Sequence, residues 1–109
     1  MSYHAVIREA GPSWTGGGIA RQPDVAAHAA FMNELAGGGF VLFAGPLAGT
    51  EDARLRVLLI VNADDDDEIR RRLADDPWSR TDRLRIASIE RWNVLIGAER
   101  LSALASSSP

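Results

Sequence analysis

Residues 54–61 read RLRVLLIV, and this stretch decides the expected fold. Its length and its content of Val, Ile and Leu predict a buried strand. Alternate positions starting at Val57 face one side of a sheet, and those starting at Leu58 face the other. Both sets are apolar, and a strand that is apolar on both sides is buried on both sides. The sequence therefore predicts that something covers each face of the sheet.

Three further strands and two helices surround this stretch. The expected strands are residues 3–8, 40–44, 54–61 and 84–96, with a bulge or bend near Ser88 in the last. The expected helices run from Pro23-Asp24 to the glycine run 37–39, and from within residues 62–67 to Pro77. This β-α-β-β-α-β order is that of the α+β ferredoxin-like plan, in which both helices cover one face of a four-stranded antiparallel sheet. Because the open face is also apolar, we expect a homodimer packed sheet to sheet.

The composition indicates one domain and excludes several kinds of chemistry. The chain has 109 residues and a mass of 11.8 kDa. We place the domain at residues 1–97 and expect the Ala- and Ser-rich residues 98–109 to form a flexible tail. No cysteine is present, and all twelve basic residues are arginine, so thiolate metal sites and a lysine Schiff base are excluded.

Charge and hydropathy indicate whether the protein is expected to bind nucleic acid or a membrane. The net charge of −3 disfavours nucleic acid, because nucleic-acid binders need basic surfaces. Apolar stretches are far shorter than a membrane span, and the first residues do not resemble a signal peptide. We therefore expect a cytoplasmic protein that binds neither nucleic acid nor membrane.

Two features that could suggest a metal or cofactor have simpler interpretations. Residues 64–67 are four consecutive aspartates, but they lack the glycine and distal glutamate of a calcium-binding loop. Acidic residues at the start of a helix complement its dipole, which explains the run without a metal. The glycine runs 16–18 and 37–39 match no nucleotide-binding motif. We expect no metal and no cofactor.

His4 and His28 are the only histidines, and histidine is the side chain best suited to proton transfer at neutral pH. His4 lies in the first expected strand, where the better interpretation is a strand residue that faces a partner or solvent. His28 lies on the same helical stripe as Met32 and Leu35, so its ring should face the sheet. The alternative for His28 is a core histidine bonded to a backbone carbonyl.

Two carboxylates could orient His28. Asp24 lies one turn earlier on the same helix, but its place at the helix start suits capping better. Asp76 precedes Pro77, which restricts it to an extended conformation and directs its side chain away from the helix. Both helices cover the same face, so Asp76 could reach His28. The alternative for Asp76 is a solvated carboxylate at the helix end.

Several segments occur in an order typical of one known family. They are residues 3–6 (YHAV), 28–35 (HAAFMNEL), 39–42 (GFVL), 44–47 (AGPL), 58–61 (LLIV), 75–78 (DDPW) and the closing strand through Trp92. With them the chain resembles the YCII-related domain family over residues 3–96. The resemblance implies a ferredoxin-like protomer that dimerises into an α+β barrel, with His28 and Asp76 as an acid–base dyad in a cleft. Some members of the family carry an arginine three residues before the histidine, and this chain has Val25 at that position. Any role of that arginine would have to be fulfilled here by Arg8 or Arg21.

These observations support two hypotheses about function. The first is a small-molecule enzyme in which the dyad performs elimination or isomerisation, a lyase- or isomerase-type reaction that needs no cofactor. One branch of the family that the chain resembles is implicated in removing hydrogen chloride from a chlorinated aromatic diol. The second is a non-catalytic module that binds a small ligand or serves a regulator. For either hypothesis the expected ligand-contacting residues, besides the dyad, are Trp14, Phe31, Gly45, Pro46, Trp78 and Arg8.

Overall fold

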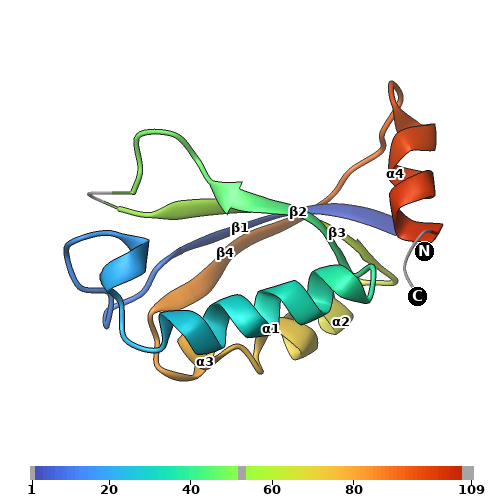
Figure 1. Ribbon diagram of the computed structural model, residues 1–109. Helices are drawn as coiled ribbons and strands as arrows, with labels where there is room; N and C mark the ends of the chain where they lie inside the picture. The colour runs from blue at the N-terminus through green and yellow to red at the C-terminus, as the bar shows by residue number, and fades with distance from the viewer. Residues whose placement is uncertain (1, 52–53, 107–109) are drawn as a thin grey trace.

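Four strands form one antiparallel sheet in the order β2-β3-β1-β4 (Figure 1). The strands are β1 (Ser2–Ala10), β2 (Val41–Pro46), β3 (Arg56–Ala63) and β4 (Leu84–Arg91). The computed structural model describes residues 2–51 and 54–106. The order of elements confirms the predicted ferredoxin-like plan, with β1 and β3 at the centre of the sheet.

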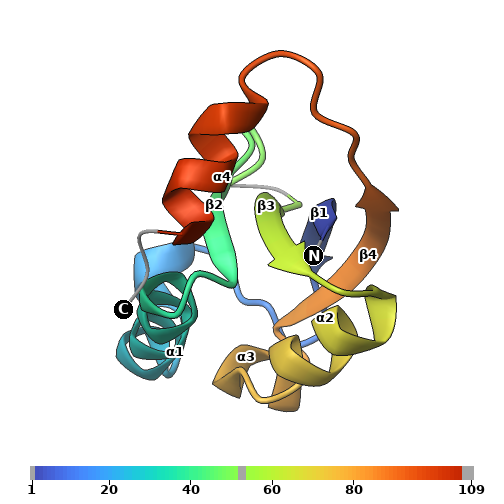
Figure 2. The same cartoon turned by 90° about the vertical axis from the view of Figure 1, so that its right-hand side faces the viewer.

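Helices cover one face of the sheet, and a C-terminal helix stands on the other side (Figure 2). The covering helices are α1 (Val25–Gly37), α2 (Asp66–Leu73) and α3 (Pro77–Arg80), and a short 3-10 turn, η1 (Ile19–Arg21), precedes α1. The fourth helix is α4 (Ala98–Ser106), which β1 meets through the hydroxyls of Tyr3 and Ser102, 3.3 Å apart. None of the helices in the described part of the chain has the length and apolar character that a membrane span requires.

The core lies between the central strands and the covering helices. Val6 of β1 pairs with Leu59 of β3 in the register, and both are fully buried. The same face of β1 carries His4 and Arg8, which are buried as well. Strand alternation thus directs two polar side chains of β1 into the space under the helices, one at each end.

A bulge in β4 lies where the sequence indicated a bulge or bend. The pairing of β1 with β4 shifts between Ile7, which faces Ser88, and Arg8, which faces Ile86. The extra residue breaks the two-residue alternation of β4, so Ile86 and Ile89 both pack against the core. Without the bulge one of the two isoleucines would face away from the helices.

The last strand is shorter than predicted. It ends at Arg91, which pairs with His4 of β1, rather than at residue 96, and the Trp92 amide still donates to the Tyr3 carbonyl at 2.9 Å. The chain then leaves the sheet and forms α4, in which Leu101 is buried. Residues 98–106 of the expected tail thus lie in this helix, and residues 107–109 lie outside the described part.

The acidic run caps α2. The Asp65 carboxylate accepts a hydrogen bond from the Glu68 amide at 2.9 Å, and the Glu68 carboxylate accepts one from the Asp64 amide at 2.7 Å. These bonds satisfy backbone donors that a helix start leaves open. The aspartates therefore have a structural role at the place where the sequence predicted a solvated helix start.

Substitution Asp65→Ala should lower the free energy of unfolding by about 1 kcal/mol, because it removes the cap while leaving a buried core intact. Asp67→Ala is the matched control, since Asp67 lies exposed in the same turn. Chemical denaturation of the two variants measures the difference. Equal losses would show that the carboxylate of Asp65 does not cap the helix.

Candidate active site

Asp76 lies in the junction between α2 and α3. The sequence predicted one helix up to Pro77, but α2 ends at Leu73, and Pro77 occupies the first position of α3. Asp76 is extended, as its place before proline requires, and its carboxylate accepts a hydrogen bond from the Trp78 amide at 3.0 Å. The acid therefore sits at the favourable, N-terminal end of a helix, whereas the sequence placed it at the unfavourable, C-terminal end.

His28 meets this carboxylate from α1. Its Nδ1 lies 2.9 Å from each carboxylate oxygen of Asp76, which is completely buried. The His28 side chain keeps 15% of its surface exposed. Asp24, the alternative partner, is exposed and offers its backbone carbonyl to the His28 amide at 2.9 Å. The structure thus pairs His28 with Asp76.

Trp78 fixes the orientation of the imidazole. The His28 and Trp78 rings are stacked, with centroids 3.8 Å apart and planes 7° from parallel. The indole Nε1 of Trp78 donates to the Pro23 carbonyl at 2.7 Å, which ties α3 to the segment before α1. Trp14 contacts the indole edge-on at a centroid distance of 5.4 Å. The ring of His28 is therefore held on one side by an aromatic face and at Nδ1 by a carboxylate.

Arg8 is a third partner of Asp76 that the sequence did not assign. Its Nη1 donates to Asp76 Oδ2 at 2.8 Å, and its Nη2 donates to Ser79 Oγ at 2.8 Å. Ser79 in turn donates to the Leu73 carbonyl at 2.8 Å. Arg8 is only 1% exposed. The partner of Arg8 lies 68 residues away in the sequence and has no local signature.

The electrostatics of the carboxylate follow from these contacts. Burial by itself would raise the pKa of Asp76, but the hydrogen bonds from His28 and the Trp78 amide, with the charge of Arg8, hold that pKa below its ordinary value. Burial also lowers the pKa of Arg8, a guanidinium that stays protonated in proteins. The site therefore contains a buried carboxylate and a buried guanidinium, both ionised.

A cavity of about 170 Å³ lies beside the dyad. His28, Arg8, Gly45, Pro46 and Trp78 all contribute to its wall. The other lining residues are apolar: Ile19, Met32, Ala44, Leu55, Val57, Leu59 and Leu84. The structure thus brings four of the six predicted ligand-contacting residues to one cavity together with His28.

The two remaining predicted wall residues do not line this cavity. Phe31 packs against the main core on the neighbouring turn of α1, and Trp14 lies behind Trp78 as described above. Arg21 of η1 is exposed and is not among the lining residues either. Phe31 lies one helical turn after His28 on α1, but its side chain packs against the main core and does not line the cavity.

The arrangement suits proton transfer. Nδ1 is engaged by Asp76, so Nε2 is the nitrogen that a ligand in the cavity could reach, and no hydrogen bond joins it to the described residues. A carboxylate that fixes one nitrogen and leaves the other to a substrate is the usual arrangement of a histidine acid–base catalyst. Within residues 2–51 and 54–106 no group of three or more His, Asp or Glu side chains is placed to hold a metal ion.

The chain is similar to proteins of one family. The sequence model of the YCII-related domain matches residues 2–93. Among solved structures, the fold is similar to that of 5-chloro-2-hydroxyhydroquinone dehydrochlorinase (TftG) from Burkholderia phenoliruptrix AC1100 in complex with 2,5-dihydroxybenzoquinone. The two chains are 23% identical with a TM-score of 0.60, and the match covers 84% of this chain and 93% of that one. Among curated proteins none matches this chain.

The geometry predicts the tautomer of His28. In the neutral imidazole the proton should reside on Nδ1, because only then can His28 donate to Asp76. Nitrogen-15 NMR distinguishes a protonated from a bare ring nitrogen and would identify the form. A neutral ring protonated at Nε2 would contradict the assigned hydrogen bond.

Asp76→Asn should change this tautomer balance, since an amide can donate to Nδ1 as well as accept from it. Asp75→Asn is the matched control, because Asp75 is the exposed neighbour and pairs with Arg80 instead. The control variant should keep the spectrum of the native protein. If both variants shift the nitrogen signals equally, Asp76 has no special hold on the ring.

Proposed function

This chain belongs to the YCII-related domain family, and we propose that it is a small-molecule enzyme in which His28 and Asp76 form the acid–base dyad. One observation carries the proposal. The buried Asp76 carboxylate lies 2.9 Å from Nδ1 of His28, whose ring borders the cavity. The proposed reaction needs no cofactor, nucleic acid or membrane, and we place it in the cytoplasm.

The proposed step is a proton transfer to Nε2 of His28. A C–H or O–H bond of the substrate breaks, its electron pair stays on the substrate, and an N–H bond forms on the imidazole. In an elimination the pair becomes a double bond while a leaving group departs with its own electrons. The imidazolium is stabilised by Asp76 and by the face of Trp78, which favours a cation above it. Return of the proton to another atom would complete an isomerisation.

The size and lining of the cavity support a small cyclic substrate. Its volume of about 170 Å³ resembles that of apolar cavities of ~150 Å³ that take up one benzene ring. The similar fold of a dehydrochlorinase solved with a hydroxylated quinone supports the same class of molecule. We therefore propose a substrate of one six-membered ring with an acidic hydroxyl or hydrogen.

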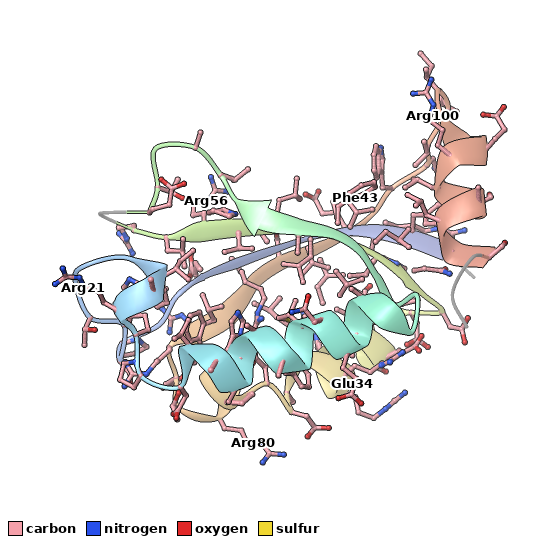
Figure 3. All side chains as sticks on the ribbon, viewed as in Figure 1. Arg21, Glu34, Phe43, Arg56, Arg80 and Arg100 are labelled. Atoms are coloured by element: carbon pink, nitrogen blue, oxygen red, sulfur yellow. The ribbon has the colours of Figure 1, made fainter. Side chains whose placement is uncertain are left out.

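We further propose that two copies pack through the open face of the sheet. Phe43 on this face is 55% exposed, and Trp92 beside it is 43% exposed. Leu58 and Ile60 of β3 line one hollow together with Trp92, and Glu90 and Arg91 complete its wall with Ala5. Figure 3 shows Phe43 on the side of the sheet opposite to Glu34 of α1. An apolar sheet face of this kind supports an isologous dimer, because each copy can cover the other.

The chemistry can be tested with 5-chloro-2-hydroxyhydroquinone by measuring chloride release. We expect the native protein to release chloride and His28→Gln to be slower by at least about 100-fold, because positioned general acids and bases contribute factors of that order. His4→Gln is the matched control, since His4 is the other histidine and lies at the far end of the same face. The control should keep the native rate.

Two outcomes would contradict the proposed chemistry. Equal rates of chloride release by the native protein and His28→Gln would show that the dyad takes no part in the reaction. Tight binding of 2,5-dihydroxybenzoquinone with no turnover of the chlorinated compound would favour a ligand-binding module over an enzyme.

The dimer can be tested by light scattering after size-exclusion chromatography. The native protein should have twice the chain mass of 11.8 kDa, and Phe43→Glu should have the single mass, because a carboxylate cannot be buried unpaired in an apolar interface. Glu34→Arg, on the exposed side of α1, should remain dimeric. A native protein that elutes at 11.8 kDa refutes the dimer.

A further inference from the structure

Arg8, Asp76 and His28 form what we call the floor of the cavity. This floor carries more charge than the His28–Asp76 pair needs to orient the imidazole. A histidine requires one carboxylate to fix its tautomer, and Asp76 provides it. Arg8 adds a full positive charge at 2.8 Å from the same carboxylate. Among the described residues that line the cavity, Arg8 and His28 are the only titratable ones. The charge state of the floor is therefore set by Arg8, Asp76 and His28.

Arg8 forms an ion pair with Asp76, but the hydrogen-bonding groups of its guanidinium are not all satisfied. Its guanidinium is almost completely buried, and its Nε lacks a hydrogen-bond partner. Burying a guanidinium with an unmet donor costs stability, and buried unmet polar groups are rare in native structures. With 1% of its surface exposed, Arg8 also has little area with which to touch a ligand. Its effect on the site must then come mainly from its charge.

That charge changes what the cavity can hold. With neutral His28 the floor has no net charge, because Arg8 balances Asp76. With protonated His28 the floor carries one net positive charge. In a largely apolar cavity an anion is stable only beside a compensating cation. Without Arg8 the imidazolium would be balanced by Asp76 alone, and an anion beside it would be uncompensated.

We infer that Arg8 makes this cavity a site for the anion of a weakly acidic ring, a phenolate- or enolate-type oxygen bound against protonated His28. The inference rests on the proposed function in using the same cavity and the same histidine. A neutral ligand binds as follows: its O–H bond breaks, an N–H bond forms at Nε2 of His28, and the electron pair stays on oxygen. The total charge of ligand and floor is zero before and after this transfer. The anion is thus formed without leaving an unbalanced charge.

The test uses 4-nitrophenol, whose ionised form has a visible absorption band that the neutral form lacks. The native protein should bind it as the phenolate, and Arg8→Met should bind that form at least about tenfold more weakly, the effect expected from removing one nearby charge. Arg8→Lys should restore most of the affinity because it restores the charge. Nitrobenzene, a ring of similar size without an acidic hydrogen, is the control and should bind the native and Arg8→Met proteins alike.

Three results would overturn the inference. They are unchanged phenolate binding by Arg8→Met, an equal loss of nitrobenzene and nitrophenol affinity in that variant, and failure of the native protein to bind nitrophenol. If Arg8→Met does not fold, calorimetry of the native protein in two buffers of different ionisation enthalpy decides. Above the pH at which the ligand ionises, binding should take up about one proton per ligand as His28 becomes charged. No uptake would overturn the inference.

This test separates the inference from the proposed reaction. Phenolate binding that depends on Arg8 in a protein that releases no chloride would refute only the reaction. If chloride release depends on His28 but phenolate affinity is unchanged by substitution of Arg8, only the role of Arg8 is refuted.

Discussion

The Asp76 carboxylate is the point that holds this fold and its cavity together. It accepts hydrogen bonds from Arg8 of β1, from His28 of α1 and from the Trp78 amide of α3. The three donors come from segments far apart in the chain, and each is placed by its own element. Because a buried carboxylate is costly unless its oxygens are bonded, all three contacts must form together. The packing of α1 and α3 on the sheet and the geometry of the site are therefore one constraint.

The second constraint is aromatic. Trp78 lies flat under His28 while its indole nitrogen is bonded to the Pro23 carbonyl. This contact joins the start of α1 to α3, so the ring that positions the histidine also closes the helical layer. The cavity wall is apolar around it, and such surroundings strengthen the few charge interactions that remain.

Several elements could be predicted from the sequence because their causes are local. Glycines marked the end of α1, and Pro77 restricted Asp76 to an extended conformation. The pairing of His28 with Asp76 followed from placing both helices on one face. The family resemblance indicated the same two residues. These predictions depend on backbone preferences that a few neighbouring residues determine.

Other features depend on contacts that no local pattern encodes. The bond of Arg8 to Asp76 joins residues 68 positions apart. The chain leaves β4 after Arg91 and goes on to form α4, and the exclusion of Phe31 from the cavity is set by packing against the core.

Asp76 serves two purposes at once, since it starts α3 and orients His28. A substitution there alters the backbone cap and the imidazole together, so a loss of activity in such a variant does not by itself identify a chemical role. Evolution faces the same coupling. A substitution of Asp76 that alters the site also weakens the start of α3. The chemistry of this cavity can therefore diversify more readily through substitutions in its apolar wall than through substitution of its carboxylate.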